Sequence, residues 1–258
     1  MTNPFLDFRS SIPYRKKEIP LGRIVRAKQE IKGCIVEGYL RLVKEEVKDL
    51  VFWLVEQRRV AKAYEEAVKS IRDLQYDQDD IEEFCAELDS SNKIPYIIAG
   101  PAGIYLSALV NLSQEDCITL RLEDYQRRFH FLGYRLPEGK TLILQGDVGD
   151  FIGAGLAGGR LMVEGSSGNW CGAWMVKGEI LVAGHTGEKT GECMRGGEIH
   201  VDGQIRGIRK TCFGGTIYRR GKLANCVFPS MPLSTSFRDR SIAAESSSSP
   251  GILVNIFE

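Results

Sequence analysis

Glycine recurs with a fixed 19-residue period through the C-terminal half of the chain. The first register consists of Gly146, Gly165, Gly184 and Gly203. Three further registers keep the same step, and their members are Gly149, Gly168 and Gly187; Gly153, Gly172 and Gly191; and Gly159, Gly178 and Gly197. A strand-like triplet follows each member of the last register, at residues 161–163, 180–182 and 199–201. So many agreeing registers indicate a structural repeat.

A 19-residue repeat has room for one strand and its turns but not for a pair of helices. Glycine at the corners allows the positive φ that a sharp change of chain direction needs. Strands of successive coils would pair in parallel, about 4.8 Å apart. The repeat therefore predicts a single-stranded right-handed β-solenoid of about four 19-residue coils over residues 138–222.

Residues one period apart in a solenoid stack into ladders, and the predicted interior ladder is apolar throughout. Its members are Leu156, Met175, Met194 and Phe213. The adjacent ladder consists of Gly155, Trp174, Cys193 and Cys212. The fourth coil departs from the pattern, since Arg206 and Lys210 replace glycines. Such a departure is typical of a terminal, capping repeat.

The segment GDVGDFIGAGLAGGRLMVEGSSGNWCGAWMVKGEILVAG carries the resemblance to a known family. It resembles the GXGXG solenoid family over about residues 141–221. That family includes the C subunit of formylmethanofuran dehydrogenase and the C-terminal domain of the glutamate synthase large subunit. The compact repeats and even period are more similar to the former.

The resemblance implies a solenoid without catalytic residues, which packs against the subunits that carry out the chemistry. No catalytic, cofactor-binding or metal-binding residue is therefore expected in this chain. Partner subunits of the formylmethanofuran type would carry a molybdenum or tungsten pterin and iron–sulfur clusters. Partners of the glutamate synthase type would carry flavin instead.

The N-terminal region, residues 1–137, matches neither relative and reads as mostly helical. Apolar residues recur at three- and four-residue steps, and Gly33 and Gly38 interrupt them, which predicts helices over about 20–31 and 36–74. Asp77 with Asp80, followed by Ile81, Phe84 and Leu88, predicts a capped second or third helix. A small mixed segment, 94–130, follows, with strands at 94–99 and 117–122 and a helix over 104–112. The overall fold class is α+β.

Both ends of the predicted solenoid need covering, because an unpaired strand edge invites aggregation. The N-terminal helices are expected to cap one end. The partly flexible tail, 223–258, contains a serine-rich stretch and an apolar end at 252–257, so it either folds back on the solenoid or docks on another subunit.

A dinucleotide-binding turn is one alternative interpretation of the mixed segment. Gly100 and Gly103 stand between a strand-like and an apolar run, and Glu123 follows at about the distance expected of the ribose-binding acidic residue. The first glycine of GxGxxG is replaced by Ile98, and a plain strand, turn and helix explains the same residues. A nucleotide-binding enzyme using residues 94–123 remains the alternative function.

Cysteine, histidine and arginine offer weaker signals. Cys193 and Cys212 would stack, which suits a disulfide, a shared metal or two buried thiols. His185 and His200 belong to different parts of the coil, a turn and a strand, and His130 lies by itself near the junction with the N-terminal region. Each is expected to be a surface or hydrogen-bonded residue. The last coil is basic and suits either an acidic partner or a solvated end; its cations are Arg195, Arg206, Arg209, Lys210, Arg219 and Arg220.

The balance of charged residues bears on which partners the chain is expected to bind. Lys and Arg total 34, as do Asp and Glu, so whole-chain charge indicates neither nucleic acid nor an anionic membrane. The chain begins without a signal-like apolar run, and its seven cysteines do not resemble a disulfide framework, so we expect a cytoplasmic location.

Three functions stay open at this stage. The first is a non-catalytic scaffold or coupling subunit of an oxidoreductase complex, most like the C subunit of formylmethanofuran dehydrogenase, with other protein subunits as partners. An alternative to it within the same family is a glutamate synthase-associated GXGXG subunit, which would serve glutamate biosynthesis. The second is the nucleotide-binding enzyme. The third is a homo-oligomeric structural protein.

Overall fold

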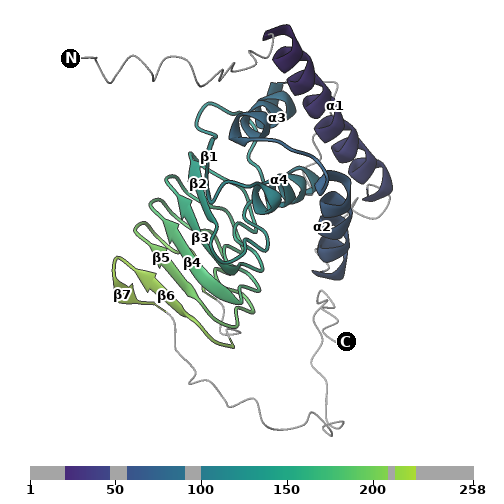
Figure 1. Cartoon of the computed structure of the whole chain (residues 1–258). Coiled ribbons are helices and arrows are strands. Elements are labelled where there is room, and N and C mark those ends of the chain that lie inside the picture. Colours follow the sequence, from purple (N-terminus) through teal and green to yellow (C-terminus); the bar gives the residue numbers. More distant parts are fainter. Residues whose placement is uncertain (1–20, 47–56, 91–99, 209–212, 225–258) are drawn as a thin grey trace, which may run out of the picture.

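The computed structural model describes residues 21–46, 57–90, 100–208 and 213–224. In these residues, four helices lie at the β1 end of a long, mostly parallel sheet (Figure 1). The helices are α1 (Leu21–Glu46), α2 (Gln57–Ile71), α3 (Gln78–Ser90) and α4 (Pro101–Leu112). The strands are β1 (Cys117–Arg121), β2 (Thr141–Gln145), β3 (Ala157–Val163), β4 (Lys177–Val182), β5 (Glu198–Val201), β6 (Thr216–Arg219) and β7 (Lys222–Leu223).

The sheet follows chain order from β1 to β7. Each of the strands β1 to β5 pairs in parallel with the strand that follows it. Thr141 pairs with Arg160, Arg160 with Glu179 and Glu179 with Glu198, so each pairing advances by one glycine period. β7 turns back and pairs antiparallel with β6. The predicted α+β architecture, with N-terminal helices and a parallel β-solenoid of about four coils, is confirmed.

The sheet also extends one strand beyond the glycine repeat. Cys117 in β1 pairs with Thr141 in β2, so this step is longer than the glycine period. The boundary expected at residue 138 therefore falls inside the sheet. The longer coil between β1 and β2 is out of step with the glycines, which is why the repeat alone does not include it.

The glycine registers serve two different purposes, whereas the sequence assigned positive φ to all of them. Gly172 has φ 67° and Gly191 has φ 69°, so these corners are left-handed as predicted. Gly165 is not left-handed; a Cβ there would collide with the backbone of Gly146 on the preceding coil. The assignment holds for Gly146 of this register, with φ 110°, but is wrong for Gly165, Gly184 and Gly203. At these three positions the close approach of successive coils excludes a side chain at any φ.

The interior ladder is confirmed for three of its four members. Leu156, Met175 and Met194 are fully buried, but Phe213 is 67% exposed. The N–H groups of Val176 and Arg195 donate to the carbonyls of Leu156 and Met175, whereas in the last coil the Phe213 N–H already donates to Met194. The last coil is one residue shorter, and a shift of one residue turns a strand-like side chain to the opposite face.

The first helix is continuous through both of its glycines, so the predicted break between residues 31 and 36 is wrong. Gly38 is buried, and a Cβ there would meet the hydroxyl of Tyr105 in α4 and Ser70 in α2. A helix glycine costs about 0.5–1 kcal/mol relative to alanine, which packing against two helices can offset. The predicted helix over 36–74 is divided between α1 and α2, and residues 47–56 lie outside the described part.

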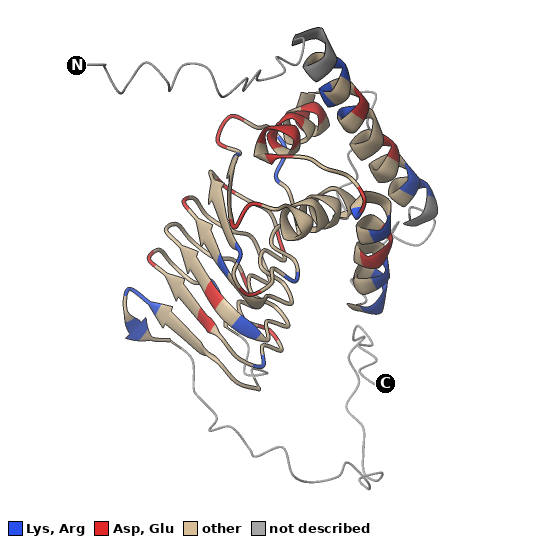
Figure 2. Ribbon diagram, in the orientation of Figure 1, with Lys and Arg blue, Asp and Glu red and all other residues tan. Residues whose placement is uncertain are grey.

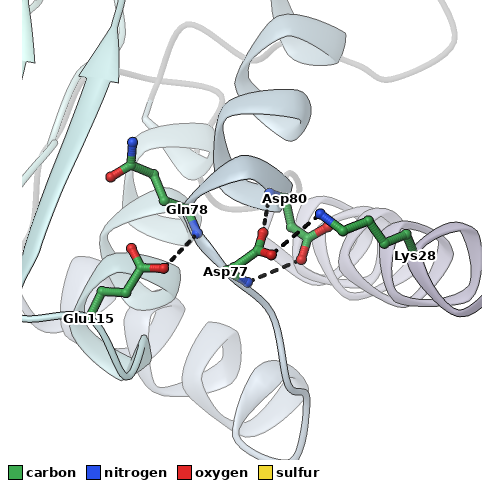
Figure 3. Close-up of polar contacts among 5 residues, drawn as sticks. All are labelled: Lys28, Asp77, Gln78, Asp80 and Glu115. Carbon is green, nitrogen blue, oxygen red and sulfur yellow. Dashed lines mark hydrogen bonds and ion pairs between the residues drawn. The ribbon is translucent and has the colours of Figure 1, made fainter. Parts of the chain in front are cut away.

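The third helix begins with the predicted cap. Asp80 N–H donates to the Asp77 carboxylate at 3.0 Å, and Asp77 N–H donates to the Asp80 carboxylate at 3.1 Å (Figure 3). Lys28 of α1 reaches the same Asp77 at 3.3 Å. The reciprocal bonds satisfy two N–H groups at the helix start, as in a capping box, and connect α3 to α1.

The next residue, Gln78, ties this helix start to the sheet. Its N–H donates to Glu115 at 3.2 Å (Figure 3), and its side-chain oxygen accepts from Thr119 N–H in β1 at 3.1 Å. The α3 helix thus occupies part of the open edge of β1, which would otherwise be free to pair with another strand.

The buried helix α4 covers the adjoining end of the solenoid. Every residue from Pro101 to Val110 is buried. Gly103 lets the helix backbone touch the His130 carbonyl, and the Ser107 hydroxyl donates to the Phe131 carbonyl at 2.8 Å. The Asn111 amide donates to the Tyr134 carbonyl at 2.9 Å. The expectation that the N-terminal helices cap one end of the solenoid is confirmed.

The mixed segment is described from residue 100 onward. The predicted strand at 117–122 is β1, and the helix predicted over 104–112 begins earlier, at Pro101. Pro101 follows Gly100, whose φ of 102° turns the chain into the helix. The strand predicted at 94–99 lies outside the described residues.

Candidate interaction surface

One ladder on the outer face of the sheet is apolar at its centre. The paired registers align Thr119, Ile143, Met162, Leu181, His200 and Tyr218, one from each strand of β1–β6. Each is partly exposed, while both of its strand neighbours on β2–β5 are buried. We call the members from β2 to β6, residues 143, 162, 181, 200 and 218, the outer stripe.

The outer stripe ends in two stacked rings. His200 and Tyr218 lie 4.7 Å apart between centroids with an interplanar angle of 14°. His200 also contacts the Glu198 carboxylate at 3.0 Å. The stripe therefore passes from aliphatic side chains on β2–β4 to an aromatic pair on β5 and β6.

Carboxylates predominate on both sides of the stripe at its middle strands. Arg160, Glu179 and Glu198 form the ladder two residues before it, and Arg160 pairs with Glu179 at 3.0 Å. On the other side, exposed Glu164 and Asp202 directly follow β3 and β5. Figure 2 shows acidic positions on the middle strands. Beside β3–β5, four carboxylates thus flank the stripe against one guanidinium.

The turns are reinforced by polar side chains that cross from coil to coil. Asp147 accepts from Ser166 N–H at 2.8 Å, Ser166 from His185 N–H at 3.1 Å, and His185 from Gln204 N–H at 2.8 Å. Each of these bonds spans 19 residues. A backbone N–H that has no carbonyl partner in the next coil is thereby satisfied.

A second polar ladder begins at the predicted junction histidine. His130 Nδ1 accepts from Asp150 N–H at 3.0 Å, Asp150 accepts from Asn169 N–H at 2.7 Å, and Asn169 accepts from Glu188 N–H at 2.8 Å. Burial lowers the pKa of His130, while the nearby Asp150 carboxylate acts in the opposite direction. All three histidines are hydrogen-bonded, as predicted, and the structure does not bring them together.

An aromatic ladder strengthens another corner. The rings of Phe131, Phe151 and Trp170 stack with centroids 4.7 Å apart at each step and interplanar angles of 2° and 4°. The Lys189 ammonium lies 4.5 Å from the Trp170 ring centroid. All four residues have positive φ. Stacking and cation–π contacts offset the strain that a left-handed backbone imposes on side-chain-bearing residues at this corner.

The basic end of the solenoid is partly built into the backbone. The Arg219 guanidinium donates to the Gly203 carbonyl at 3.0 Å, and that of Arg220 donates to the Asp202 carbonyl at 2.9 Å. These two cations therefore help to hold the last coil on the one before it. Arg209 and Lys210 lie outside the described residues.

Of the two cysteines in the adjacent ladder, the structure describes only Cys193. Cys193 is partly buried and left-handed, with φ 58°, and Cys212 lies outside the described residues. Cys171 is fully buried in the solenoid, and burial raises the pKa of its thiol to about 11. This residue acts as a small apolar side chain in the core.

The residues of the dinucleotide-type turn have packing roles. Gly100 and Gly103 are both buried, against Phe131 and the His130 carbonyl. Protein atoms therefore cover the start of α4, where a phosphate would need access. Glu123 lies elsewhere, beside Gly146.

Glu123 lines a pocket of about 430 Å³ together with Tyr125, Arg128 and Asp147. Arg128 and Asp147, both in this lining, pair at 3.1 Å. Burial raises the pKa of Tyr125 to about 12. The pocket therefore presents an ion pair and a neutral phenol, and it is separate from the start of α4.

Sequence reasoning missed the outer stripe, although its signal is present in the triplets at 161–163 and 180–182. Both triplets are apolar at all three positions, not only at the two that face the core. Within the described ranges, no three His, Cys, Asp or Glu side chains form a group that could hold a metal ion. None of the helices described here is long and apolar enough to cross a membrane.

Comparisons with known proteins leave the chain without a match. No protein-family model matches it, and neither a curated protein nor a solved structure does.

Proposed function

We propose that this protein is a non-catalytic scaffold or coupling subunit of an oxidoreductase complex, most like the C subunit of formylmethanofuran dehydrogenase. The observation that carries the proposal is the 19-residue glycine register, which folds into stacked parallel coils as the resemblance requires. Left-handed corners at Gly153, Gly172 and Gly191 and close backbone approach at Gly165 account for the spacing of the motif.

A scaffold needs stiffness, and the coils are connected in several independent ways. Parallel strands, two polar ladders and an aromatic ladder all cross from coil to coil at successive positions. A repeat structure of this kind gains stability from each interface between neighbours and presents long, regular surfaces. Such surfaces favour extended contact with other subunits over a concave catalytic pocket.

The chemistry would belong to the partners under this proposal. Molybdenum or tungsten pterin and iron–sulfur clusters would mark the formylmethanofuran type, and flavin would mark the glutamate synthase type. A nucleotide-binding role for residues 94–123 has less support, because packing of α4 on the first coil accounts for Gly103.

The test is purification of the tagged full-length chain from its native cells, with mass spectrometry and with metal and flavin analysis of the same sample. Co-purifying pterin-dependent or glutamate synthase subunits in fixed stoichiometry would support the proposal and select the type. A lone chain that carries its own nucleotide or chromophore would overturn it, as would a homo-oligomer without other subunits.

A further inference from the structure

We infer that the outer stripe is a docking surface for an amphipathic helix of a partner subunit, with an apolar face and Lys or Arg along both edges. The inference rests on the proposed function and names the surface and the chemistry of the partner. Its residues are Ile143, Met162, Leu181, His200 and Tyr218.

The first argument is the apolar character of both faces of the central strands. In β3, Leu161 and Val163 face the core and are buried, yet Met162 between them is also apolar. A sheet with one face in water alternates apolar and polar residues, whereas strands covered on both faces are continuously apolar. The triplets 142–144, 161–163 and 180–182 of β2–β4 are therefore typical of strand segments covered on both sides.

The described helices do not supply that second cover. They lie at the β1 end of the sheet, and β1 is the strand that α3 contacts (Figure 1). Met162 and Leu181 belong to β3 and β4, farther along the stack, and stay partly exposed in the described part of the chain. Their exposure leaves an apolar surface that a second molecule can cover.

Charge decides which kind of segment fits. Glu179 and Glu198 border the stripe on one side, and Glu164 and Asp202 border it on the other. Arg160 is the one cation among the residues that flank the stripe beside β3–β5, and it already pairs with Glu179. A partner with basic residues on both edges of its apolar face complements this arrangement, while an acidic one would be repelled.

Dimensions favour a helix that runs along the stack. The five strands of the outer stripe, about 4.8 Å apart, give it a length of roughly 19 Å from Ile143 to Tyr218. A helix rises 1.5 Å per residue, so about 13 residues would cover that length. One apolar face of such a helix matches a single straight ladder, with its basic residues over the flanking carboxylates.

The direct test uses two synthetic peptides and the full-length chain. Both have about 13 residues, the length that spans the outer stripe, and both have the same leucine face. One carries lysine along both edges of that face, and its twin carries glutamate there. Titration followed by fluorescence anisotropy is expected to show binding of the Leu/Lys peptide at least about tenfold tighter than its twin. High salt should weaken the binding of the Leu/Lys peptide, because salt screens the attraction between its lysines and the carboxylates that flank the stripe.

Two variants locate the binding. Leu181→Glu places a charge in the middle of the outer stripe. It should lower the affinity for the Leu/Lys peptide by at least about tenfold. Val176→Glu is the matched control, because Val176 is 54% exposed and precedes β4 outside the stripe; it should bind like the parent. Equal binding of both peptides, or equal loss in both variants, would overturn the inference.

The same variants separate this inference from the proposed function. In native cells, Leu181→Glu should lose the co-purifying subunits while Val176→Glu keeps them. If both variants keep them, the partners dock elsewhere and the inference fails while the function stands. If the parent chain associates with itself and Leu181→Glu abolishes that association, a second copy covers the stripe and the inference is wrong.

Discussion

Gly191 approaches Ile217 across the solenoid interior so closely that a Cβ on Gly191 would lie 2.6 Å from the Ile217 Cδ1 atom. Gly191 belongs to the turn before β5, and Ile217 belongs to β6 of the following coil. The same relationship links Gly153 with Ile180, also at 2.6 Å. A glycine corner and the strand of the following coil thus fill one space in the interior.

Replacing Gly191 with valine is expected to destabilise the C-terminal half strongly. The left-handed backbone costs a non-glycine residue about 1–3 kcal/mol, and over-packing against Ile217 adds about 1–3 kcal/mol. Chemical denaturation followed by circular dichroism measures the change. Gly221→Ala is the control, because Gly221 is left-handed like Gly191, with φ 71°, but a Cβ there would meet nothing within 4 Å. A Gly191→Val variant as stable as the parent would refute the corner assignment.

The one-residue shortening of the last coil predicts opposite results for two residues that the glycine period treats as equivalent. Met194→Ala should cost about 2–5 kcal/mol, because it removes a fully buried side chain. Phe213→Ala should change stability by less than about 0.5 kcal/mol, since Phe213 is 67% exposed. Equal losses of unfolding free energy in the two variants would show that Phe213 continues the interior ladder after all.

The sequence predicted the solenoid because its glycines record a contact that recurs with every coil. Gly165 approaches Gly146 and Gly184 approaches Gly165, so each coil repeats the requirement of the last. The sequence did not predict the first coil, because Cys117 pairs with Thr141 across a connection longer than the glycine period. Phe213 was misplaced for a similar reason, since a single missing residue changes a side chain's face without changing its type.

The candidate surface was harder to predict than the fold. A triplet such as 161–163 indicates a strand, but only the paired registers show that Met162 aligns with Ile143 and Leu181 on the outer face. The flanking carboxylates come from two separate ladders, which no local window connects. The sequence predicted that N-terminal helices cap one end of the solenoid, but not the contacts that Ser107 and Asn111 of α4 make, because the carbonyls they bind are distant in the chain.

The two glycines of α1 are expected to respond to alanine in opposite directions. Gly33 is exposed and has nothing within 4 Å of a built Cβ, so Gly33→Ala should stabilise the protein by about 0.5–1 kcal/mol. Gly38→Ala would push the Tyr105 hydroxyl from the Ile35 carbonyl, to which it donates at 2.9 Å. Leaving that buried hydroxyl unsatisfied costs about 1–3 kcal/mol. Thermal unfolding of both variants measures the contrast, and a helix that truly broke near residue 33 would show neither effect.

Stability should fall as the pH drops below the ordinary histidine range, because of His130. Burial lowers its pKa in the folded protein, and its unprotonated Nδ1 accepts the hydrogen bond from Asp150 N–H. The sign follows from linkage: the unfolded chain takes up the proton first, near its unperturbed pKa of about 6.5. The contribution of neutral His130 is therefore complete above that pH and is lost as the pH falls toward the folded pKa.

Replacing His130 with asparagine tests this assignment, because asparagine already occupies the same ladder at Asn169 and accepts an N–H there through its side-chain oxygen. The variant keeps an acceptor but cannot titrate. Urea unfolding from about pH 7.5 downward should show a shallower decline in unfolding free energy for His130→Asn than for the parent, with the curves diverging below about pH 6.5. Parallel curves over that interval would mean that other groups cause the decline and that unfolding does not change the protonation of His130.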